Sequence, residues 1–353
     1  MKGRCWKLPG LAVISPIPNA ASPPQPLLHT NVEEQSSDQV SAAPQPTMKL
    51  LMLDTKPVAD TAAGTGTIET PVRRLDSSDR GLQRAEGACR IIVGGSGKGT
   101  RIMDLYQKSP IRVLFPRTGN DPPQEAVLVN TSGGVAGGDS LQSTVTAVSG
   151  ASIAVTTQAA EKIYRALDES ARIFTKLNVD NGAKLAWLPQ ETIVFNHARL
   201  CRRTEIEVSP GSELLALECL VLGRAARGEK LSAGDIIDSW HVSRNGQLQW
   251  GDTFRLTNEV FSHLSRKALL WDSTAVATLI YSGADLDERL QLIRAEFISF
   301  DCQCSATLVG GILVARLAAR SSFELKAALR NLLQEFGQQN AAGPFRLPKM
   351  WSC

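Results

Sequence analysis

The pattern of apolar and polar positions predicts strands along most of the chain, from about Leu82 onward. Short apolar runs bounded by Pro and Gly, at Ile111–Phe115 and Ala126–Val129, are typical of buried strands. Polar and apolar residues alternate in Thr204–Val208, as expected of a strand with one solvated face. The chain is therefore predicted to be mainly β.

Glycine-containing turns separate the predicted strands. Ser149-Gly150, Asn181-Gly182 and Asn245-Gly246 each have the form of a two-residue hairpin turn, and Pro210-Gly211 marks a fourth turn. The predicted hairpins are Thr144–Val148 with Ser152–Thr156, Ile173–Val179 with Ala183–Leu188, and Ser239–Arg244 with Gln247–Gly251. The four glycines lie 32, 29 and 35 residues apart. This irregular spacing indicates stacked strand layers, in either a sandwich or a coil of strands similar to a β-helix.

Helical periodicity appears only near the C-terminus. Leu286–Phe297 and Phe323–Phe336 each repeat apolar residues on one face with charges opposite. The serines at 321 and 322 are candidate N-caps for the second helix. Between the two helices, Ala306–Ala315 has the pattern of one strand. The expected architecture is a large body of layered strands with a small α+β C-terminal part that contains two helices.

The N-terminal region differs from the rest in composition. Eight of the 18 prolines lie in its first 46 residues, which carry few charges and no hydrophobic periodicity. Such a segment buries too little apolar surface to offset the entropy lost on ordering. We expect a Pro-rich disordered extension at residues 1–83 and one folded domain at 84–353. A secretory signal is the competing interpretation, because Lys2, Arg4 and Lys7 precede the short apolar patch Leu11–Ile14. Met48 is an alternative start.

Composition narrows the function classes. With 38 Lys+Arg against 35 Asp+Glu, the net charge is only +3, and no cluster of basic residues predicts a nucleic-acid partner. No apolar stretch approaches the roughly 20 residues of a membrane span, so no membrane partner is expected. Seven cysteines without a disulfide framework, read as reduced thiols, favour a cytoplasmic location. Four histidines leave little for an imidazole-based metal site.

The glycine-rich segment Gly94–Thr100 invites comparison with a phosphate-binding loop. The Walker A pattern requires a glycine where Ile92 stands and a Ser or Thr where Gly99 stands. The favoured interpretation is a flexible turn between two strands. A nucleotide-dependent enzyme using this loop remains one alternative function. A β-sandwich ligand-binding module is a second, although only 5% of the residues are aromatic.

A second glycine-rich segment, Asn130–Asp139, follows a predicted strand directly. Its two glycine pairs are Gly133 with Gly134 and Gly137 with Gly138. Glycines at this density permit positive φ angles and close approach of the backbone to other groups. The segment is compatible with an anion-binding nest, a tight interface, a passage walled by main chain, or an ordinary wide turn.

Three further segments carry unusual polar residues. Thr156–Arg165 and Trp187–Phe195 mix polar and charged side chains into apolar strands without catalytic spacing, which favours an internal polar network or a partner surface. Trp187 is a candidate core anchor or interface residue. Cys302 and Cys304 alternate along a predicted strand, and buried structural thiols are favoured over metal ligands because no further ligand stands at zinc-site spacing. No catalytic residue is predicted.

Several segments together closely resemble the UreD family of urease accessory proteins, called UreH in some bacteria. The motifs that carry the resemblance are Ile111–Arg117, Asn130–Asp139, Thr157–Arg165, Trp187–Thr192, Leu222–Glu229 and Leu347–Trp351. The resemblance covers about residues 84–353. The motif residues taken as candidate site residues are Gln158, Glu161, Lys162, Tyr164, Arg165, Trp187, Pro189, Gln190, Gly223, Arg224, Gly228 and Glu229.

The resemblance implies a β-rich maturation factor rather than an enzyme. UreD-like proteins bind UreF, which docks the GTPase UreG, and the assembly engages apo-urease to deliver nickel. GTP would then belong to UreG alone, and this chain would hold no cofactor stably, only Ni²⁺ in transit.

The family's proposed mechanism is a water-filled passage that conducts nickel. By motif position, Asp139 and Asp252 would face this passage as transient metal ligands, and the four glycines at 133, 134, 137 and 138 would narrow its wall. Carboxylate and water oxygens suit a conduit because they exchange nickel more readily than imidazoles or thiolates do.

Overall fold

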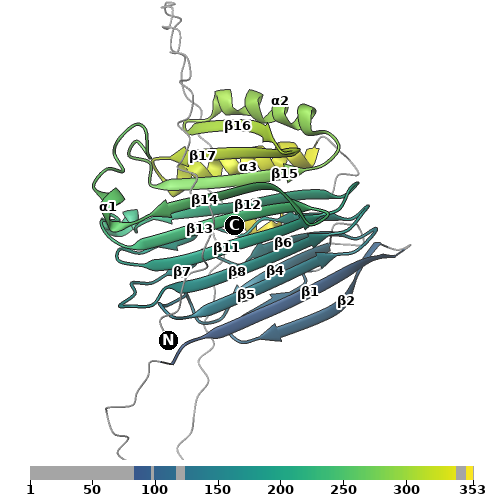
Figure 1. Ribbon diagram of the computed structural model, residues 1–353, viewed down its shortest axis with the longest axis horizontal. Helices are drawn as coiled ribbons and strands as arrows, with labels where there is room; N and C mark the ends of the chain where they lie inside the picture. Colours follow the sequence, from purple (N-terminus) through teal and green to yellow (C-terminus); the bar gives the residue numbers. More distant parts are fainter. Residues whose placement is uncertain (1–82, 97–98, 117–123, 339–346, 353) are drawn as a thin grey trace, which may run out of the picture. The chain divides into compact units, whose positions relative to one another are not determined.

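The computed structural model describes residues 83–96, 99–116, 124–338 and 347–352. Residues 1–82, and with them nearly all of the predicted Pro-rich extension, lie outside the described ranges. Strands dominate the described residues and form two large sheets, here called sheet A and sheet B (Figure 1). The prediction of a mainly β protein with layered strands is confirmed.

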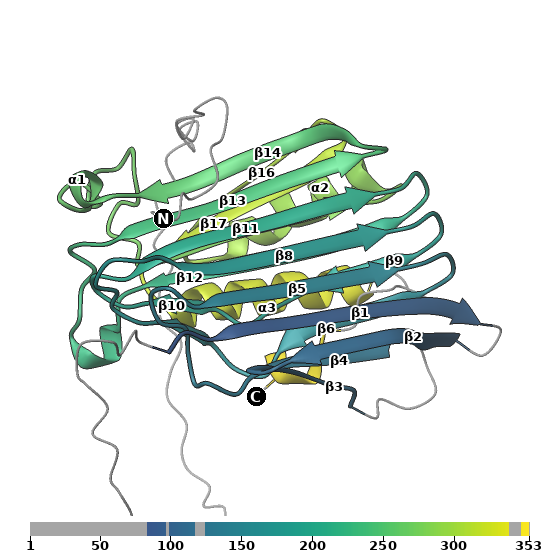
Figure 2. The same cartoon turned by 60° about the horizontal axis from the view of Figure 1, so that its bottom comes forward.

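Sheet A has seven strands, most of which run side by side in the same direction (Figure 2). In spatial order they are β14 (Gln247–Leu256), β13 (Asp235–Arg244), β11 (Arg199–Val208), β8 (Ala171–Val179), β5 (Ser140–Ala147), β1 (Glu86–Ser96) and β2 (Gly99–Lys108). The strands from β13 to β1 pair in parallel, whereas β14 and β2 pair antiparallel at the two edges.

Sheet B has ten strands. Its main path runs through β16 (Gln303–Val309), β17 (Ile312–Ala319), β15 (Ala275–Ser282), β12 (Glu213–Leu222), β9 (Lys184–Trp187), β6 (Ser152–Thr157), β4 (Gln124–Asn130) and β3 (Ile111–Leu114). Two short strands extend the sheet next to β12: β10 (Thr192–Val194) pairs with β12, and β7 (Glu161–Ile163) pairs with β10. The central pairs β12–β9, β9–β6 and β6–β4 are parallel.

The chain alternates between the two sheets and so forms a coil of strands. It passes from β5 in sheet A to β6 in sheet B, returns to β8, and repeats this path through β9, β11, β12 and β13. The turns at Gly150, Gly182 and Gly211 connect sheet A to sheet B, and successive turns stack, with Gly182 N donating to Gly211 O at 3.3 Å. Of the two predicted arrangements, the coil is the one that forms.

Two of the three predicted hairpins are therefore wrong. Thr144–Val148 and Ser152–Thr156 lie in different sheets, and so do Ile173–Val179 and Ala183–Leu188. A short turn with a glycine at positive φ fits a sharp corner between sheets as well as a hairpin, so the local sequence does not distinguish them. Only β13 and β14 form the predicted hairpin, around Asn245 and Gly246, which both have positive φ.

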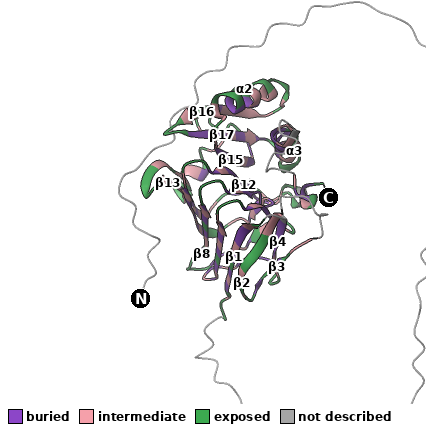
Figure 3. Cartoon of the chain, turned by 90° about the vertical axis from the view of Figure 1, so that its right-hand side faces the viewer, coloured by how far each residue is buried: buried purple, intermediate pink, exposed green. Residues whose placement is uncertain are grey.

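The burial pattern of each sheet follows from what covers it. Strand β11 alternates buried and partly exposed residues, because one face of sheet A packs inward and the other faces solvent. Strand β12 is buried at nearly every position, because sheet B is covered on both faces (Figure 3). One face of β12 packs against sheet A, and the other packs beneath α3 (Ser322–Gln338).

The C-terminal part adds helices to the outer face of sheet B. The helices α2 (Leu286–Glu296) and α3 match the two predicted segments (Figure 1). Ser321 caps α3 as predicted: Glu324 N donates to Ser321 Oγ and Ser321 N to Glu324 Oε2, both at 3.2 Å. A third, four-residue helix, α1 (Asn258–Phe261), was not predicted. No described helix is long and apolar enough to cross a membrane.

The predicted single strand Ala306–Ala315 is wrong, because it is interrupted by a turn. Gly310 and Gly311, with φ of 57° and 70°, form the turn of a hairpin between β16 and β17. Two consecutive residues at positive φ are characteristic of a type I′ hairpin turn, and Gly-Gly is one of the residue pairs that favour it.

The glycine-rich segment at 94–100 joins β1 to β2. These two strands pair antiparallel from Ala88 with Lys108 to Ser96 with Gly99. The predicted turn between two strands is confirmed, and the two strands form a hairpin, with residues 97 and 98 outside the described ranges. A phosphate-binding loop leads from a strand into a helix, and here the chain continues as strand β2.

Candidate functional site

A cavity of about 180 Å³ lies between the two sheets. Sheet A contributes to its lining Leu141, Ser143, Ile173, Thr175 and Arg202. Sheet B and the neighbouring loops contribute Ile111, Leu128, Val129, Asn130, Gly133, Thr157, Gln158, Ala159, Ala160, Glu161, Lys162, Trp187, Pro189, Gln190, Thr192 and Glu218. Apolar walls thus enclose a small set of polar and charged groups.

One end of the cavity is formed by exposed residues and holds Glu161. Gly133, Gln158 and Lys162 are exposed lining residues, so the cavity reaches the protein surface there. Glu161 Oε2 accepts a hydrogen bond from Asn130 Nδ2 at 3.0 Å, and its Oε1 accepts one from the backbone N of Lys162 at 3.1 Å. Burial raises the pKa of Glu161, and these two hydrogen bonds partly oppose the increase.

The inner end of the cavity contains a buried ionic network centred on Arg202. Its guanidinium donates to Asp238 through Nε at 2.9 Å and Nη2 at 2.7 Å, and through Nη1 to Glu218 Oε2 at 2.6 Å. Nη1 also donates to Thr192 Oγ1 at 3.1 Å, and Trp187 Nε1 donates to Glu218 Oε1 at 2.9 Å. The network links both sheets, because Arg202 and Asp238 belong to sheet A and Glu218 to sheet B.

This network places more negative than positive formal charge at the inner end. Arg202, Glu218 and Asp238 are all buried, and one guanidinium faces two carboxyl groups. Burial raises the pKa of Glu218, whereas the charge of Arg202 lowers it. When both carboxyl groups are ionised, one negative charge has no matching positive charge. A proton or a cation bound at Glu218 would balance it.

The C-terminal motif supports the cavity wall beside Gln190. Trp351 Nε1 donates to Leu188 O at 2.9 Å, and Gln190 Nε2 donates to Met350 O at 3.3 Å. Gln190 N donates to Thr157 Oγ1 at 2.8 Å. Two motifs more than 150 residues apart in the sequence thus meet at this wall.

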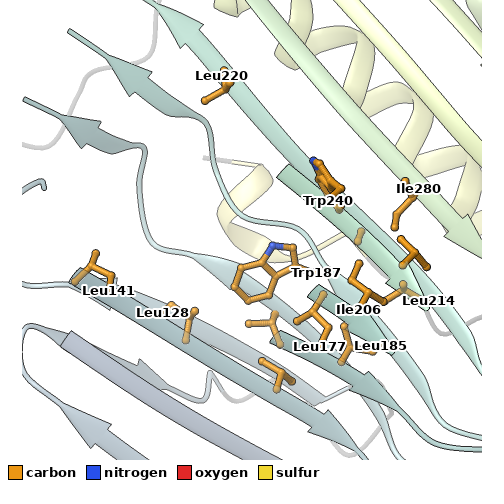
Figure 4. Packing of buried hydrophobic residues seen from close by; sticks show 14 of the residues in the cluster. Leu128, Leu141, Leu177, Leu185, Trp187, Ile206, Leu214, Leu220, Trp240 and Ile280 are labelled. Carbon is orange, nitrogen blue, oxygen red and sulfur yellow. The ribbon is translucent and has the colours of Figure 1, made fainter. Parts of the chain in front are cut away.

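Trp187 lies in the core, as its buried apolar surroundings show (Figure 4). Leu177 and Ile206 from sheet A and Leu185 from sheet B lie on one side of the indole. The ring therefore serves both as core packing and, through its N–H group, as a hydrogen-bond donor to Glu218.

The glycine-rich segment 130–139 forms a compact turn closed by Asp139. Asp139 Oδ1 accepts from Ala85 N and its Oδ2 from Ala136 N, both at 2.8 Å. Gly134 has no room for a side chain, because a Cβ there would lie 2.6 Å from the Tyr164 ring. Of the four predicted glycines, Gly133 lines the cavity, whereas Gly134, Gly137 and Gly138 are not among its lining residues.

Asp252 lies on β14 and is ion-paired. Its Oδ2 is 2.7 Å from Arg316 Nη2 on β17, an interaction that joins the edge strand β14 of sheet A to the second strand of sheet B. Neither Asp252 nor Asp139 is among the residues that line the cavity. Their predicted role as nickel ligands stays a prediction.

A second group of motif residues meets outside the cavity. Arg224 bonds Glu229, which also accepts from Asn196 N at 2.7 Å. The Arg224 guanidinium stacks 4.1 Å from the centroid of Phe195, and Tyr164 meets the same ring edge-on at 5.2 Å. The hydrogen bond from Arg224 is the main cause that holds the pKa of Glu229 below its usual value.

The remaining motif residues shape the backbone around this group. Gly228 ends the short helix η1 (Ala225–Arg227) with a φ of 68°, and a Cβ on Gly223 would meet Glu229 O at 2.7 Å. Arg165 pairs with Ala198 in an isolated bridge. Gly223 and Gly228 thus allow the tight backbone path of the loop that follows β12.

The cavity thus brings together part of the predicted set: Gly133, Gln158, Glu161, Lys162, Trp187, Pro189 and Gln190. Sequence reasoning missed Asn130 as the partner of Glu161, and it missed Arg202 and Glu218 altogether. The sequence signal for Arg202 is its position in β11. It lies on the same face of this strand as Leu200 and Thr204, and that face is buried. A charged residue at an inward position indicates a buried ionic partner.

The described cysteines differ from the prediction in two respects. Cys201 is disulfide-bonded, so the expectation of reduced thiols throughout is wrong for this residue. Cys302 and Cys304 are free thiols but partly exposed, not buried as favoured from the sequence. Among the described residues, no group of three or more His, Cys, Asp or Glu side chains is placed to hold a metal ion.

The fold and the site define a class of protein: a β-rich scaffold coiled from two sheets, with a charged cavity enclosed between them. Within that class, the model of the family described as UreD urease accessory protein matches residues 85–352. The chain belongs to this family, and a role in urease maturation follows from the membership.

Individual relatives agree with the family match. The chain is 38% identical over 277 residues to a urease accessory protein UreD from Methylobacterium sp. (strain 4-46), covering 76% of this chain and 95% of the relative. It is 39% identical over 270 residues to UreD from Xanthobacter autotrophicus, covering 76% and 91%. The corresponding protein of Azorhizobium caulinodans is 38% identical over 270 residues, covering 76% and 97%. All three are named accessory proteins, which suggests a non-catalytic role.

Proposed function

We propose that this chain is a nickel-insertion factor that binds UreF, and through it the GTPase UreG, on apo-urease and conducts Ni²⁺ toward the urease active site. The observation that carries the proposal is the cavity between the sheets. It reaches the surface beside Glu161 and extends inward to Glu218 and Arg202. In this account Ni²⁺ is cargo, and GTP is bound by UreG alone.

The chemistry of the lining supports transit of a cation. The lining includes carboxylates, amides and hydroxyls, among them Glu161, Gln190 and Glu218, together with the cationic side chains of Lys162 and Arg202. Oxygen ligands bind Ni²⁺ less tightly than imidazole or thiolate ligands do. A path with oxygen ligands at its outer and inner ends lets the ion exchange from one to the next without a stable complex.

The charge balance at the inner end also favours a cation. The positive charge of Arg202 is already paired with Asp238 through two hydrogen bonds. Arg202 also bonds Glu218, so Glu218 and Asp238 together carry one negative charge in excess of the guanidinium when both are ionised. An arriving Ni²⁺ displaces any proton on Glu218, because a nearby dication lowers the pKa of a carboxyl group.

Asp139 and Asp252 form a separate part of the proposal. Each has a partner that explains it without nickel, namely two backbone N–H groups and Arg316 respectively. A direct role is testable with Asp139→Ala and Asp252→Ala variants. Full urease activation by variants that assemble normally would remove both residues from the nickel path.

The experiment that tests the function is reconstitution. Apo-urease, UreF and UreG are incubated with Ni²⁺ and GTP, with and without this chain, and urease activity is measured after co-purification of the complex. We expect activation to depend on the chain. Unchanged activation in its absence would overturn the proposal.

A matched pair of variants tests the path itself. Glu161→Gln changes the charge at the outer end of the cavity, whereas Glu169→Gln makes the same change at an exposed position that does not line it. Both variants should assemble with UreF. We expect slower nickel-dependent activation for Glu161→Gln alone, and equal rates would contradict a path past Glu161.

A further inference from the structure

Two free thiols, Cys302 and Cys304, lie close together at the edge of sheet B. Cys304 is in β16, the outermost strand of the sheet, and Cys302 lies at a bend just before this strand. Both side chains are partly exposed, whereas Cys89 and Cys219 are buried. Among the four free thiols of the described residues, this pair is the one open to reagents from solvent.

The Cys304 sulfur turns back toward residue 302. Its Sγ is 3.7 Å from Cys302 O and 3.8 Å from Phe297 O. The bend at Cys302 thus folds the Cys304 side chain back against residue 302, which makes the two thiols near neighbours.

The two neighbouring thiols are unequal. Interaction with the Cys304 thiol lowers the pKa of Cys302, and interaction with Cys302 together with burial raises the pKa of Cys304. Burial raises the pKa of Cys89 and Cys219 instead. A thiolate is the reactive form of cysteine, so Cys302 is suited to attack and Cys304 to supply the second thiol.

We propose that Cys302 and Cys304 form a reversible oxidation site that a hydroperoxide, such as hydrogen peroxide, converts to a disulfide. The Cys302 thiolate attacks one peroxide oxygen, the O–O bond breaks, and the departing hydroxide takes a proton to leave as water. Cys302 is then a sulfenic acid. The Cys304 sulfur attacks the Cys302 sulfur, the S–O bond breaks, and hydroxide leaves with the Cys304 proton as a second water. Two thiols lose two electrons, and one peroxide becomes two waters.

Oxidation also changes a contact beyond the pair. The Cys304 thiol loses the proton that it donates to Phe297 O, at the start of the turn η2 (Phe297–Ser299). The disulfide therefore removes a link between β16 and the end of α2. This site is independent of the proposed nickel path, because neither cysteine lines the cavity.

The test uses the full-length chain and peptide mass spectrometry. The chain is treated with hydrogen peroxide, its remaining thiols are alkylated with N-ethylmaleimide, and the peptide that contains residues 302–304 is analysed. We expect this peptide to lose two hydrogen atoms and both maleimide adducts, and dithiothreitol to restore both adducts. Peptides that contain Cys89 and Cys219 serve as internal controls and should keep their thiols.

Two variants assign the roles of the sulfurs. In Cys304→Ser, the sulfenic acid should persist on Cys302 and react with dimedone, whereas in Cys302→Ser, Cys304 should remain an alkylatable thiol. Circular dichroism checks that both variants fold. The proposal is overturned if peroxide leaves both thiols of the wild-type chain open to maleimide, or if dimedone labels Cys304 in Cys302→Ser as readily as Cys302 in Cys304→Ser.

Discussion

At the scale of single residues, the hydrogen-bond partners of each acidic side chain decide what it does. Asp139 accepts hydrogen bonds from two backbone N–H groups and closes a turn. Glu161 lines a cavity and accepts hydrogen bonds from Asn130 and from the backbone N of Lys162. Both are acidic residues in family motifs. The sequence motifs do not distinguish the two residues. The structure shows that Asp139 anchors a turn and that Glu161 lines the cavity.

The anchoring role of Asp139 predicts a stability effect. Asp139→Ala leaves the N–H groups of Ala85 and Ala136 without their acceptor, which should lower the free energy of unfolding by about 1–3 kcal/mol. Asp252→Ala breaks a more exposed ion pair with Arg316 and should cost about 1 kcal/mol or less. Urea denaturation of both variants checks this, and an equal loss would argue against the anchoring role.

The raised pKa of Glu161 predicts a pH dependence. A carboxyl group whose pKa is higher in the folded chain than its unfolded value of about 4.3 binds more protons when folded, so its contribution to stability falls as pH rises through the folded pKa. Glu161→Gln removes this dependence. The stability of the variant relative to wild type should therefore increase from about pH 4 to about pH 8. Urea denaturation at both pH values measures it, and a decrease would contradict the burial of an ionisable Glu161.

At the scale of elements, the sequence predicts strands more reliably than their partners. Apolar runs and alternation mark β4, β8 and β11, because each strand must bury at least one face. Pairing between successive coils joins residues about 30 positions apart, and no local signal specifies it. The glycines at 150 and 182 mark real turns, yet whether a turn closes a hairpin or crosses between sheets depends on the coil as a whole.

The Arg202 network predicts strong coupling between the two sheets. Arg202→Met leaves Glu218 and Asp238 buried without their cation, and the loss in unfolding free energy should be about 3–5 kcal/mol. Adding Glu218→Gln and Asp238→Asn to Arg202→Met removes the unpaired charges and should recover part of that loss. If the triple variant is less stable than Arg202→Met alone, desolvated charge is not what couples the sheets.

At the scale of the whole molecule, the sequence revealed the family and some of the cavity wall. Glu161, Trp187 and Gln190 stand in motifs whose resemblance identified them, and all three line the cavity. Glu218 and Arg202 escaped prediction because their strands meet only when the coil closes, so neither charge has its partner nearby in the sequence. The cavity is a product of the fold rather than of any one segment.

The central claim is that Ni²⁺ passes through the cavity between the sheets, and filling the cavity tests it most directly. Thr175→Phe places a ring at a lining position, whereas Thr144→Phe makes the same change on the solvent-facing side of the neighbouring strand β5. Nickel-dependent activation of apo-urease is measured for each variant assembled with UreF and UreG. The account predicts that Thr175→Phe assembles but loses most activation, while Thr144→Phe activates like wild type. Full activation by a folded, assembled Thr175→Phe variant would contradict the passage.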